Sequence, residues 1–233
     1  MKKIFLLLFV IIINLISYRE AKSDCPPGWF ENVITADFQY QYDGVIYTCR
    51  VIIVFCCRWN ADLQMPEIIP KGAYAASGYN DCFHMIEQHP ELKDTLIRFI
   101  FAEMSKVAKT NPNCFPQCPP CDENIPKLYY RIIAYKCVKW ISKPAIRLIN
   151  GTVLEWADGI EFCDNLDYKC ILTYACCCDW NTSPPSCYEW CISAEQYGTS
   201  ECSNQEPQVP PPGKDWNEPW ETECFITNVC RCP

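Results

Sequence analysis

Apolar and polar residues alternate over residues 33–42, which is the pattern of a β-strand with one face in water. The turn dipeptide Asp43-Gly44 follows, and residues 45–55 are then rich in β-branched side chains and apolar on both faces. We therefore expect residues 33–58 to form a hairpin whose second strand is central and buried. A helix through the second half of this stretch is the alternative, which β-branching and the preceding turn disfavour.

A different period appears over residues 90–107, where apolar positions recur every three to four residues and Pro90 occupies the first turn. This pattern predicts an amphipathic helix that ends near Asn111-Pro112. It follows a stretch with Pro66, Pro70 and Gly72, which indicates a loop. We expect this helix to be the one substantial helix, bridging or buttressing the β-rich segments on either side.

The second half of the chain is again strand-like. A long apolar and aromatic run covers residues 128–141, and the dipeptides Asn150-Gly151 and Asp158-Gly159 predict two further hairpin turns. The strands that these turns imply lie near 145–149, 152–156 and 160–163.

One stretch occurs twice. The fourteen residues from Tyr47 to Asn60 recur 121 residues later, from Tyr168 to Asn181, and a likeness of Gly78–Cys82 to Gly198–Cys202 extends the repeat to a closing cysteine, Cys82 or Cys202. A repeat of this kind indicates a duplicated module rather than an activity. The identical pairs are Tyr47/Tyr168, Cys49/Cys170, Cys56/Cys177, Cys57/Cys178, Trp59/Trp180 and Asn60/Asn181.

These patterns together predict a β-rich α+β fold, in which two related, disulfide-stapled antiparallel β modules are joined by one amphipathic helix. The expected segments are a signal peptide over 1–23, a first cysteine-rich β module over 24–83, a helical bridge over 84–113, a second, enlarged cysteine-rich β module over 114–203, and a Pro-rich linker with a Cys-rich C-terminal tail over 204–233. Three cysteines in the last ten residues predict that this tail docks on the body.

The first residues predict export. Lys2 and Lys3 precede an apolar run over residues 4–16, and Ala21 and Ser23 are the small residues that a signal peptidase reads. A transmembrane anchor is the alternative, but the run has about 13 residues where about 20 are needed. We expect a secreted protein, extracellular or periplasmic, with no stable membrane insertion of the mature chain.

Cysteine content agrees with export. All 20 cysteines follow residue 24, and an even number at this density predicts a disulfide scaffold without a cofactor. Cys56 and Cys57 are adjacent, so in a strand they point to opposite faces and are expected to bond to different partners. The predicted first module holds five cysteines, so at least one must bond outside it.

Residues 114–121 carry a Cys-x3-Cys-x2-Cys spacing that resembles an iron–sulfur loop, and Cys114, Cys118 and Cys121 also suit zinc. In an exported chain disulfides are favoured over either site, because thiols oxidise there.

Charge restricts the partners. Without residues 1–23 the chain has 16 basic and 27 acidic side chains, so the predicted mature protein is acidic and nucleic acid is not an expected partner.

Residues that carry catalytic chemistry are scarce. Only two histidines occur, His84 and His89, and no serine lies in a nucleophile motif. Many acids are present, so a carboxylate-based hydrolase stays open, although the sequence leans against an enzyme. Trp216 and Trp220 are candidate binding residues, either as an exposed aromatic platform or as a clamp that holds the Pro-rich segment on the body.

Two stretches, Asn150-Gly-Thr152 and Asn181-Thr-Ser183, match the glycan acceptor pattern. We expect an extracellular binding or structural protein, such as an adhesin or surface-assembly component, that binds a protein or glycan at the cell surface or assembles with itself. A secreted carboxylate-based hydrolase and a disulfide-stapled inhibitor or toxin are the alternatives.

Overall fold

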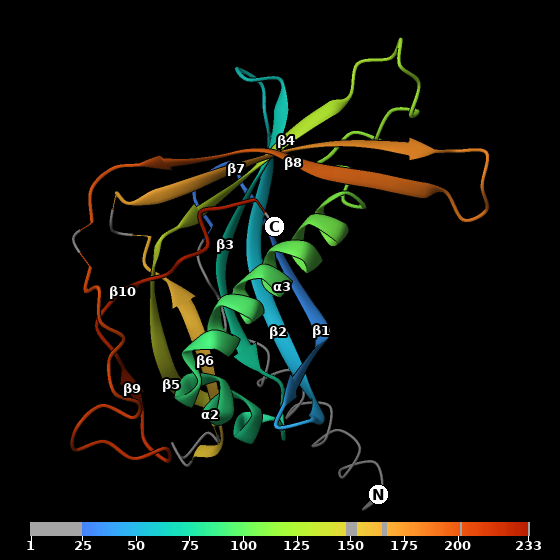
Figure 1. Ribbon diagram of the computed structural model, residues 1–233. Coiled ribbons are helices and arrows are strands. Elements are labelled where there is room, and N and C mark those ends of the chain that lie inside the picture. The colour runs from blue at the N-terminus through green and yellow to red at the C-terminus, as the bar shows by residue number, and fades with distance from the viewer. Residues whose placement is uncertain (1–24, 148–152, 165–166, 201, 233) are drawn as a thin grey trace, which may run out of the picture.

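The computed structural model describes residues 25–147, 153–164, 167–200 and 202–232, which form one curled, β-rich sheet and two helices (Figure 1). The predicted signal peptide and the Asn150-Gly151 turn lie outside these residues. The elements are β1 (Phe30–Tyr42), β2 (Val45–Asn60), β3 (Met65–Ala75), α2 (Asn80–Gln88), α3 (Pro90–Ala108), β4 (Leu128–Tyr135), β5 (Cys137–Arg147), β6 (Val153–Phe162), β7 (Lys169–Asp179), β8 (Ser186–Tyr197), β9 (Trp220–Glu221) and β10 (Phe225–Ile226).

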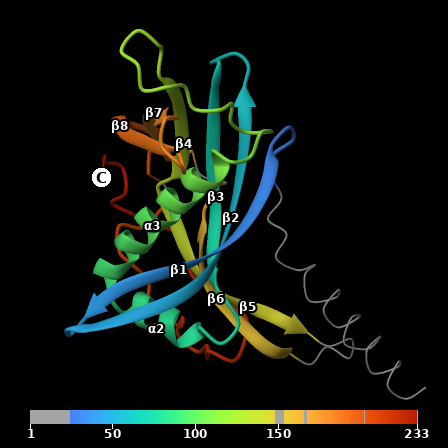
Figure 2. The same cartoon turned by 90° about the vertical axis from the view of Figure 1, so that its right-hand side faces the viewer.

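The predicted N-terminal hairpin is confirmed. Strands β1 and β2 pair antiparallel from Phe30↔Cys57 to Tyr42↔Val45. Asp43 and Gly44 both have positive φ, at 48° and 77°, which suits the right-handed twist of a two-residue hairpin. The tip of this hairpin projects beyond the helices (Figure 2).

The expected loop around Pro66 and Pro70 is instead the central strand, β3. It pairs antiparallel with β2 along its whole length, and the register shifts between Val54 and Phe55, where Phe55 lies opposite Pro70. Proline has no N–H to donate to the ladder, so it is tolerated where the pairing is already irregular. The prolines therefore did not prevent the strand that organises the sheet.

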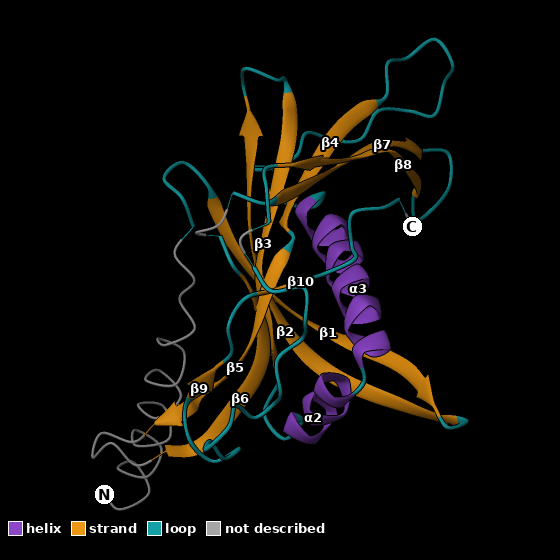
Figure 3. Cartoon of the chain, turned by 60° about the vertical axis from the view of Figure 1, so that its left-hand side comes forward, coloured by secondary structure: helices purple, strands orange, loops and turns teal. Residues whose placement is uncertain are grey.

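The sheet branches at β3. One edge of β3 pairs with β2, while its other edge pairs with β4 in parallel at Glu67 and Ile68 and with β6 antiparallel over Gly72–Tyr74. One branch continues to β7 and β8, and the other continues to β5 and the short strands β9 and β10 (Figure 3). The three-stranded arrays β1–β2–β3 and β4–β7–β8 each hold a copy of the repeated stretch in their middle strand, but all these strands belong to one sheet. The division into two modules stays a prediction.

The helix predicted to begin at Pro90 is α3, and a shorter helix, α2, which was not predicted, precedes it. His89 is in an extended conformation, φ −126° and ψ 90°, because the residue before a proline is disfavoured in a helix. Helix α2 therefore ends at Gln88, and α3 begins at Pro90. Helix α3 lies across one face of the sheet (Figure 1). Its side chains in the main core are Leu92, Leu96, Ile97, Ile100, Phe101, Met104 and Ala108.

Two other strand predictions were wrong. The run over residues 128–141 is divided between β4 and β5, which lie in different branches, and the break falls at Lys136. The Nζ of this buried lysine donates to the Tyr168 hydroxyl at 2.9 Å and to Gln196 Oε1 at 2.7 Å.

The expected turn at Asp158-Gly159 lies inside β6, because glycine there permits close approach of β3 rather than a reversal of the chain.

We expect Gly159→Ala to destabilise the protein by about 1–3 kcal/mol through overpacking. A Cβ at this position would lie 2.6 Å from the Ala73 carbonyl oxygen and 2.7 Å from Tyr74 Cδ1, on neighbouring β3. Chemical denaturation of the oxidised protein measures the change. An unchanged midpoint would show that β3 and β6 separate easily.

All 20 cysteines form ten disulfides. The adjacent pair bonds to different partners, Cys56 to Cys25 and Cys57 to Cys114, as predicted, and the second of these is the expected bond from the first module to a later segment. The tail also docks as predicted, through Cys163–Cys224, Cys170–Cys230 and Cys191–Cys232. Disulfides of this number fit an extracellular location.

Candidate functional site

An exposed face of the β4–β7–β8 branch is rich in aromatic side chains. In the antiparallel ladders, alternate residues of each strand point to the same side, and the inner positions Tyr130, Leu172 and Cys170 belong to the core. The other positions form the opposite surface. We call this surface the aromatic face; it consists of Tyr129, Arg131, Ile133 and Tyr135 of β4, Lys169, Ile171, Thr173 and Ala175 of β7, and Tyr188, Trp190, Ser193, Glu195 and Tyr197 of β8.

A bulge in β8 aligns this face. Thr173 pairs with Ser193, whereas the next residue, Tyr174, pairs with Cys191, so Ile192 is an extra residue in β8. The shift places Tyr197 on the same side as Trp190, although the two are seven positions apart. Without the bulge, a period of two would put them on opposite faces.

The large side chains of the aromatic face are in contact with solvent. Tyr129, Tyr188, Trp190 and Tyr197 are between 40% and 57% exposed, and the bulged Ile192 is 50% exposed. Singly exposed apolar residues are ordinary, but a contiguous group on one face is typical of an interaction surface.

Polar groups surround the aromatic rings. Lys169 Nζ lies 5.6 Å from the ring centre of Tyr135, and Glu195 accepts hydrogen bonds from the Tyr197 hydroxyl and from Ser193. The hydrogen bond from Tyr197 lowers the pKa of Glu195, so this carboxylate is charged at neutral pH. The face therefore offers apolar area together with fixed charges of both signs.

Strand β8 is also an edge. Within the part of the chain that the structure describes, it pairs only with β7, and it contains Glu189 and Glu195 but no lysine or arginine. An edge strand presents unpaired N–H and C=O groups that accept a further strand.

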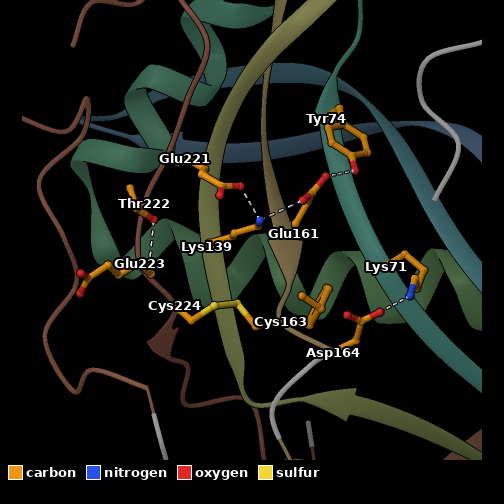
Figure 4. A pocket seen from close by; sticks show the side chains of 11 residues that line it. Lys71, Tyr74, Lys139, Glu161, Cys163, Asp164, Glu221, Thr222, Glu223 and Cys224 are labelled. Carbon is orange, nitrogen blue, oxygen red and sulfur yellow. Dashed lines mark hydrogen bonds and ion pairs between the residues drawn. A yellow bond between two sulfur atoms is a disulfide. The ribbon is translucent and has the colours of Figure 1, made fainter. Parts of the chain in front are cut away.

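A second feature is a polar cleft of about 730 Å³ between β3, β5, β6 and the C-terminal segment, walled by the Cys163–Cys224 disulfide (Figure 4). Lys139 reaches two carboxylates in it, Glu221 at 2.6 Å and Glu161 at 3.7 Å, and Glu161 also accepts from the Tyr74 hydroxyl at 2.7 Å. Lys71 forms an ion pair with Asp164 at the other end.

Glu161 of this cleft is held in the charged state. Burial opposes ionisation of Glu161, but hydrogen bonds from Lys143 and Tyr74 outweigh it and lower the pKa of this carboxyl. A general acid for glycosidic cleavage needs a raised pKa instead. The cleft is a structural ion-pair network in its present geometry.

The two tryptophans predicted as binding residues lie together beside α2 and β5. Trp220 is buried, and its ring centre lies 5.6 Å from that of Trp216, which in turn contacts the His84 ring at 3.7 Å. Only Trp216 therefore keeps part of its surface in water, and a binding role for the pair stays a prediction.

Sequence reasoning missed the position of His84. Its Nε2 lies 2.7 Å from Oδ2 of buried Asp158, so the side chain links α2 to β6. No spacing in the sequence signals this contact, because 74 residues separate the two groups.

The repeated residues occupy matching strands but not wholly matching bonds. Cys56 and Cys177 bond to Cys25 and Cys121, which precede β1 and β4 respectively. Cys49 bonds to Cys82, whereas its counterpart Cys170 bonds to Cys230. Cys82, at the end of the first copy, bonds within that copy, whereas Cys202, at the end of the second copy, bonds to Cys137 outside it. Of the remaining repeat members, Cys57 and Cys178 bond to Cys114 and Cys187. The others are Tyr47 and Tyr168, half-buried and buried, Trp59 and Trp180, both partly exposed, and Asn60 and Asn181, half-buried and exposed.

The three cysteines of the suspected metal loop are also disulfide-bonded, Cys114 to Cys57, Cys118 to Cys176 and Cys121 to Cys177. Among the described residues, no group of three or more His, Cys, Asp or Glu side chains is arranged to hold a metal ion. Neither α2 nor α3 has the length and apolar character needed to cross a bilayer, and these are the helices of the described chain.

Comparison with known proteins gives no relative: no family model, no curated protein and no solved structure matches this chain.

Proposed function

We propose that this protein is an extracellular binding protein, acting as an adhesin or surface-assembly component, that recognises an extended basic segment of a partner protein. The segment lies along the edge of β8 and covers the aromatic face. The observation that carries the proposal is the group of uncovered aromatic side chains next to a strand with one unpaired edge.

The side chains of the aromatic face suit protein recognition. Tyrosine, tryptophan and arginine are enriched at the energetic centres of protein interfaces, and Tyr188, Trp190 and Arg131 are of these types. Strands β7 and β8 are held by the disulfides Cys121–Cys177 and Cys178–Cys187, so little conformational entropy is lost when a partner binds.

The edge of β8 favours an extended partner. A peptide added to a sheet edge obtains affinity from main-chain hydrogen bonds, and its alternate side chains meet the two faces of the sheet. Strand β8 runs for 12 residues, which is long for an edge strand.

Charge favours a basic partner. Glu195 of this strand lies on the aromatic face as a charged carboxylate, and the whole chain has a formal net charge of −8. This charge attracts basic segments at long range and repels acidic ones.

Screening a displayed library of 12-residue peptides against the oxidised protein tests the proposal. We expect binders with alternating apolar residues and an excess of lysine and arginine, and their affinity falls as salt is raised. Hydrogen exchange with a bound peptide is expected to slow at the β8 amides.

The variant Tyr188→Ser/Trp190→Ser is expected to weaken peptide binding at least about tenfold, the size of a typical hot-spot loss. The matched control is Phe30→Ser/Val33→Ser on β1, which removes exposed apolar side chains from another edge strand and leaves binding unchanged. Equal losses in both variants, or a protein that uses β8 to bind its own copies instead of peptides, would contradict the proposal.

The two alternative functions, a hydrolase and a stapled inhibitor or toxin, have less support. A hydrolase needs one carboxyl with a raised pKa and one charged carboxylate in an open cleft, and Glu161 in the polar cleft has a lowered pKa. A stapled inhibitor or toxin has no specific observation in its favour.

A further inference from the structure

A second cavity, of about 540 Å³, lies between α3, the inner side of β7 and β8, and the C-terminal segment. It lies mainly behind the aromatic face, because Leu172 and Glu189 line it from the opposite side of the sheet, although Trp190 of that face also reaches its lining. The volume lies within the range of small-molecule sites.

The wall of this cavity is largely apolar. Phe101 and Ala102 of α3, Leu172 of β7 and Val229 of the C-terminal segment contribute to it. The disulfides Cys170–Cys230 and Cys191–Cys232 hold the C-terminal segment in place as one side of the cavity.

Cationic groups at this cavity are not neutralised. One nitrogen of Arg98, Nη2, is shielded from solvent and has no hydrogen-bond partner among the described residues. Arg231 also lines the cavity, is exposed, and forms no ion pair with any described residue. A buried guanidinium nitrogen without a partner costs free energy, and an oxyanion placed against it removes this cost.

The one carboxylate that lines the cavity does not cancel this charge. Glu189 is in an ion pair with Lys109 and accepts from the Tyr130 hydroxyl at 2.9 Å. Asp94 lies one turn before Arg98 on α3, but its Oδ1 is likewise buried without a partner, so the two groups do not satisfy each other. The cavity is therefore positively charged, although the whole chain has a net negative charge.

We propose that this cavity binds a small amphiphile with one carboxylate head and an apolar body. The carboxylate pairs with Arg98 and is assisted by Arg231, and the body contacts Phe101, Leu172 and Val229. A single negative charge fits better than the double charge of a phosphate ester, because the net negative charge of the chain repels the second charge.

Calorimetric titration of the oxidised full chain with decanoate tests this site, with 1-decanol as the neutral probe of equal length. We expect decanoate to bind about 10- to 100-fold more tightly than decanol, because a hydrogen bond to a charged group contributes a binding free energy that corresponds to this ratio. In Arg98→Met this preference is expected to disappear while decanol binding is kept. Arg98→Lys restores part of it.

The matched control is Lys106→Gln, which removes one positive charge from the solvent side of the same helix and leaves the preference unchanged. The melting temperature and the disulfide content of each variant separate loss of binding from loss of fold. Equal affinity of the two probes, no binding of either, or a preference that survives Arg98→Met in a folded protein would overturn the proposal.

Discussion

Replacing Glu87 with glutamine is expected to stabilise the protein at pH 7, by on the order of 1–3 kcal/mol. Glu87 is buried on α2, and neither of its carboxylate oxygens has a hydrogen-bond partner among the described residues. Burial raises the pKa of this carboxyl well above 4.5, and the charges of Asp158 and Glu206 raise it further. An amide of the same shape carries no charge to desolvate.

The pH dependence of this effect has a definite sign. Because the folded-state pKa lies above the unfolded value, the folded protein binds the proton more tightly, and stability falls as pH rises from about 4.5 through the folded-state pKa. Below pH 4.5 the native protein and Glu87→Gln are expected to be similarly stable. The gap between them opens with rising pH, and denaturant titrations at several pH values measure it.

Glu206→Gln is the matched control, because this neighbouring acid is satisfied. Glu206 accepts from Trp140 Nε1 at 2.9 Å and forms an ion pair with buried Lys93. Removing its charge leaves that lysine without its partner, so we expect destabilisation instead. A Glu87→Gln protein that is less stable at pH 7 would contradict the account of Glu87.

Local patterns predicted the parts of the fold that local physics determines. Alternation and the Asp43-Gly44 turn located the first hairpin, Pro90 marked the start of a helix, and the adjacent Cys56 and Cys57 implied two different disulfide partners. Each of these signals acts over a few residues, so the sequence displays it directly.

The rest depends on contacts between distant residues. Strand β3 tolerates Pro70 because of a register shift opposite Phe55, and β6 continues through Gly159 because β3 packs against it. Neither reason is visible before the strands are paired. The same holds for the bond between Cys202 and Cys137, because the sequence cannot assign disulfide partners.

The candidate sites were the hardest to predict. The aromatic face joins residues of β4, β7 and β8 only through strand register, and the bulge at Ile192 changes which β8 side chains point outward. Arg98 belongs to a helix that the sequence predicted, but the residues opposite it come from the C-terminal segment. Trp216 and Trp220 were chosen by their type and by their position beside the Pro-rich segment, and neither property decides between an exposed platform and a clamp; the burial of Trp220 depends on distant contacts.

Removing the disulfide Cys57–Cys114, by replacing both cysteines with alanine, is expected to cost about 4 kcal/mol. The bond joins β2 to the segment that follows α3, with a sequence separation of 57 residues, so it restricts β3, α2 and α3 together in the unfolded chain. Both cysteines are buried in the main core, so the loss includes packing as well as chain entropy. Denaturant titration of the oxidised variant, after its remaining disulfides are verified by peptide mapping, measures the loss.

The bond Cys178–Cys187 provides the comparison, because it closes a separation of only 9 residues between neighbouring strands. Its double alanine variant is expected to lose about 2.5 kcal/mol, since the entropy of a closed loop grows with the logarithm of its length. The expected order is therefore a larger loss for the longer loop, by about 1.5 kcal/mol. If the Cys178→Ala/Cys187→Ala protein is the less stable of the two, packing at β7 and β8, rather than chain entropy, sets the contribution of these disulfides.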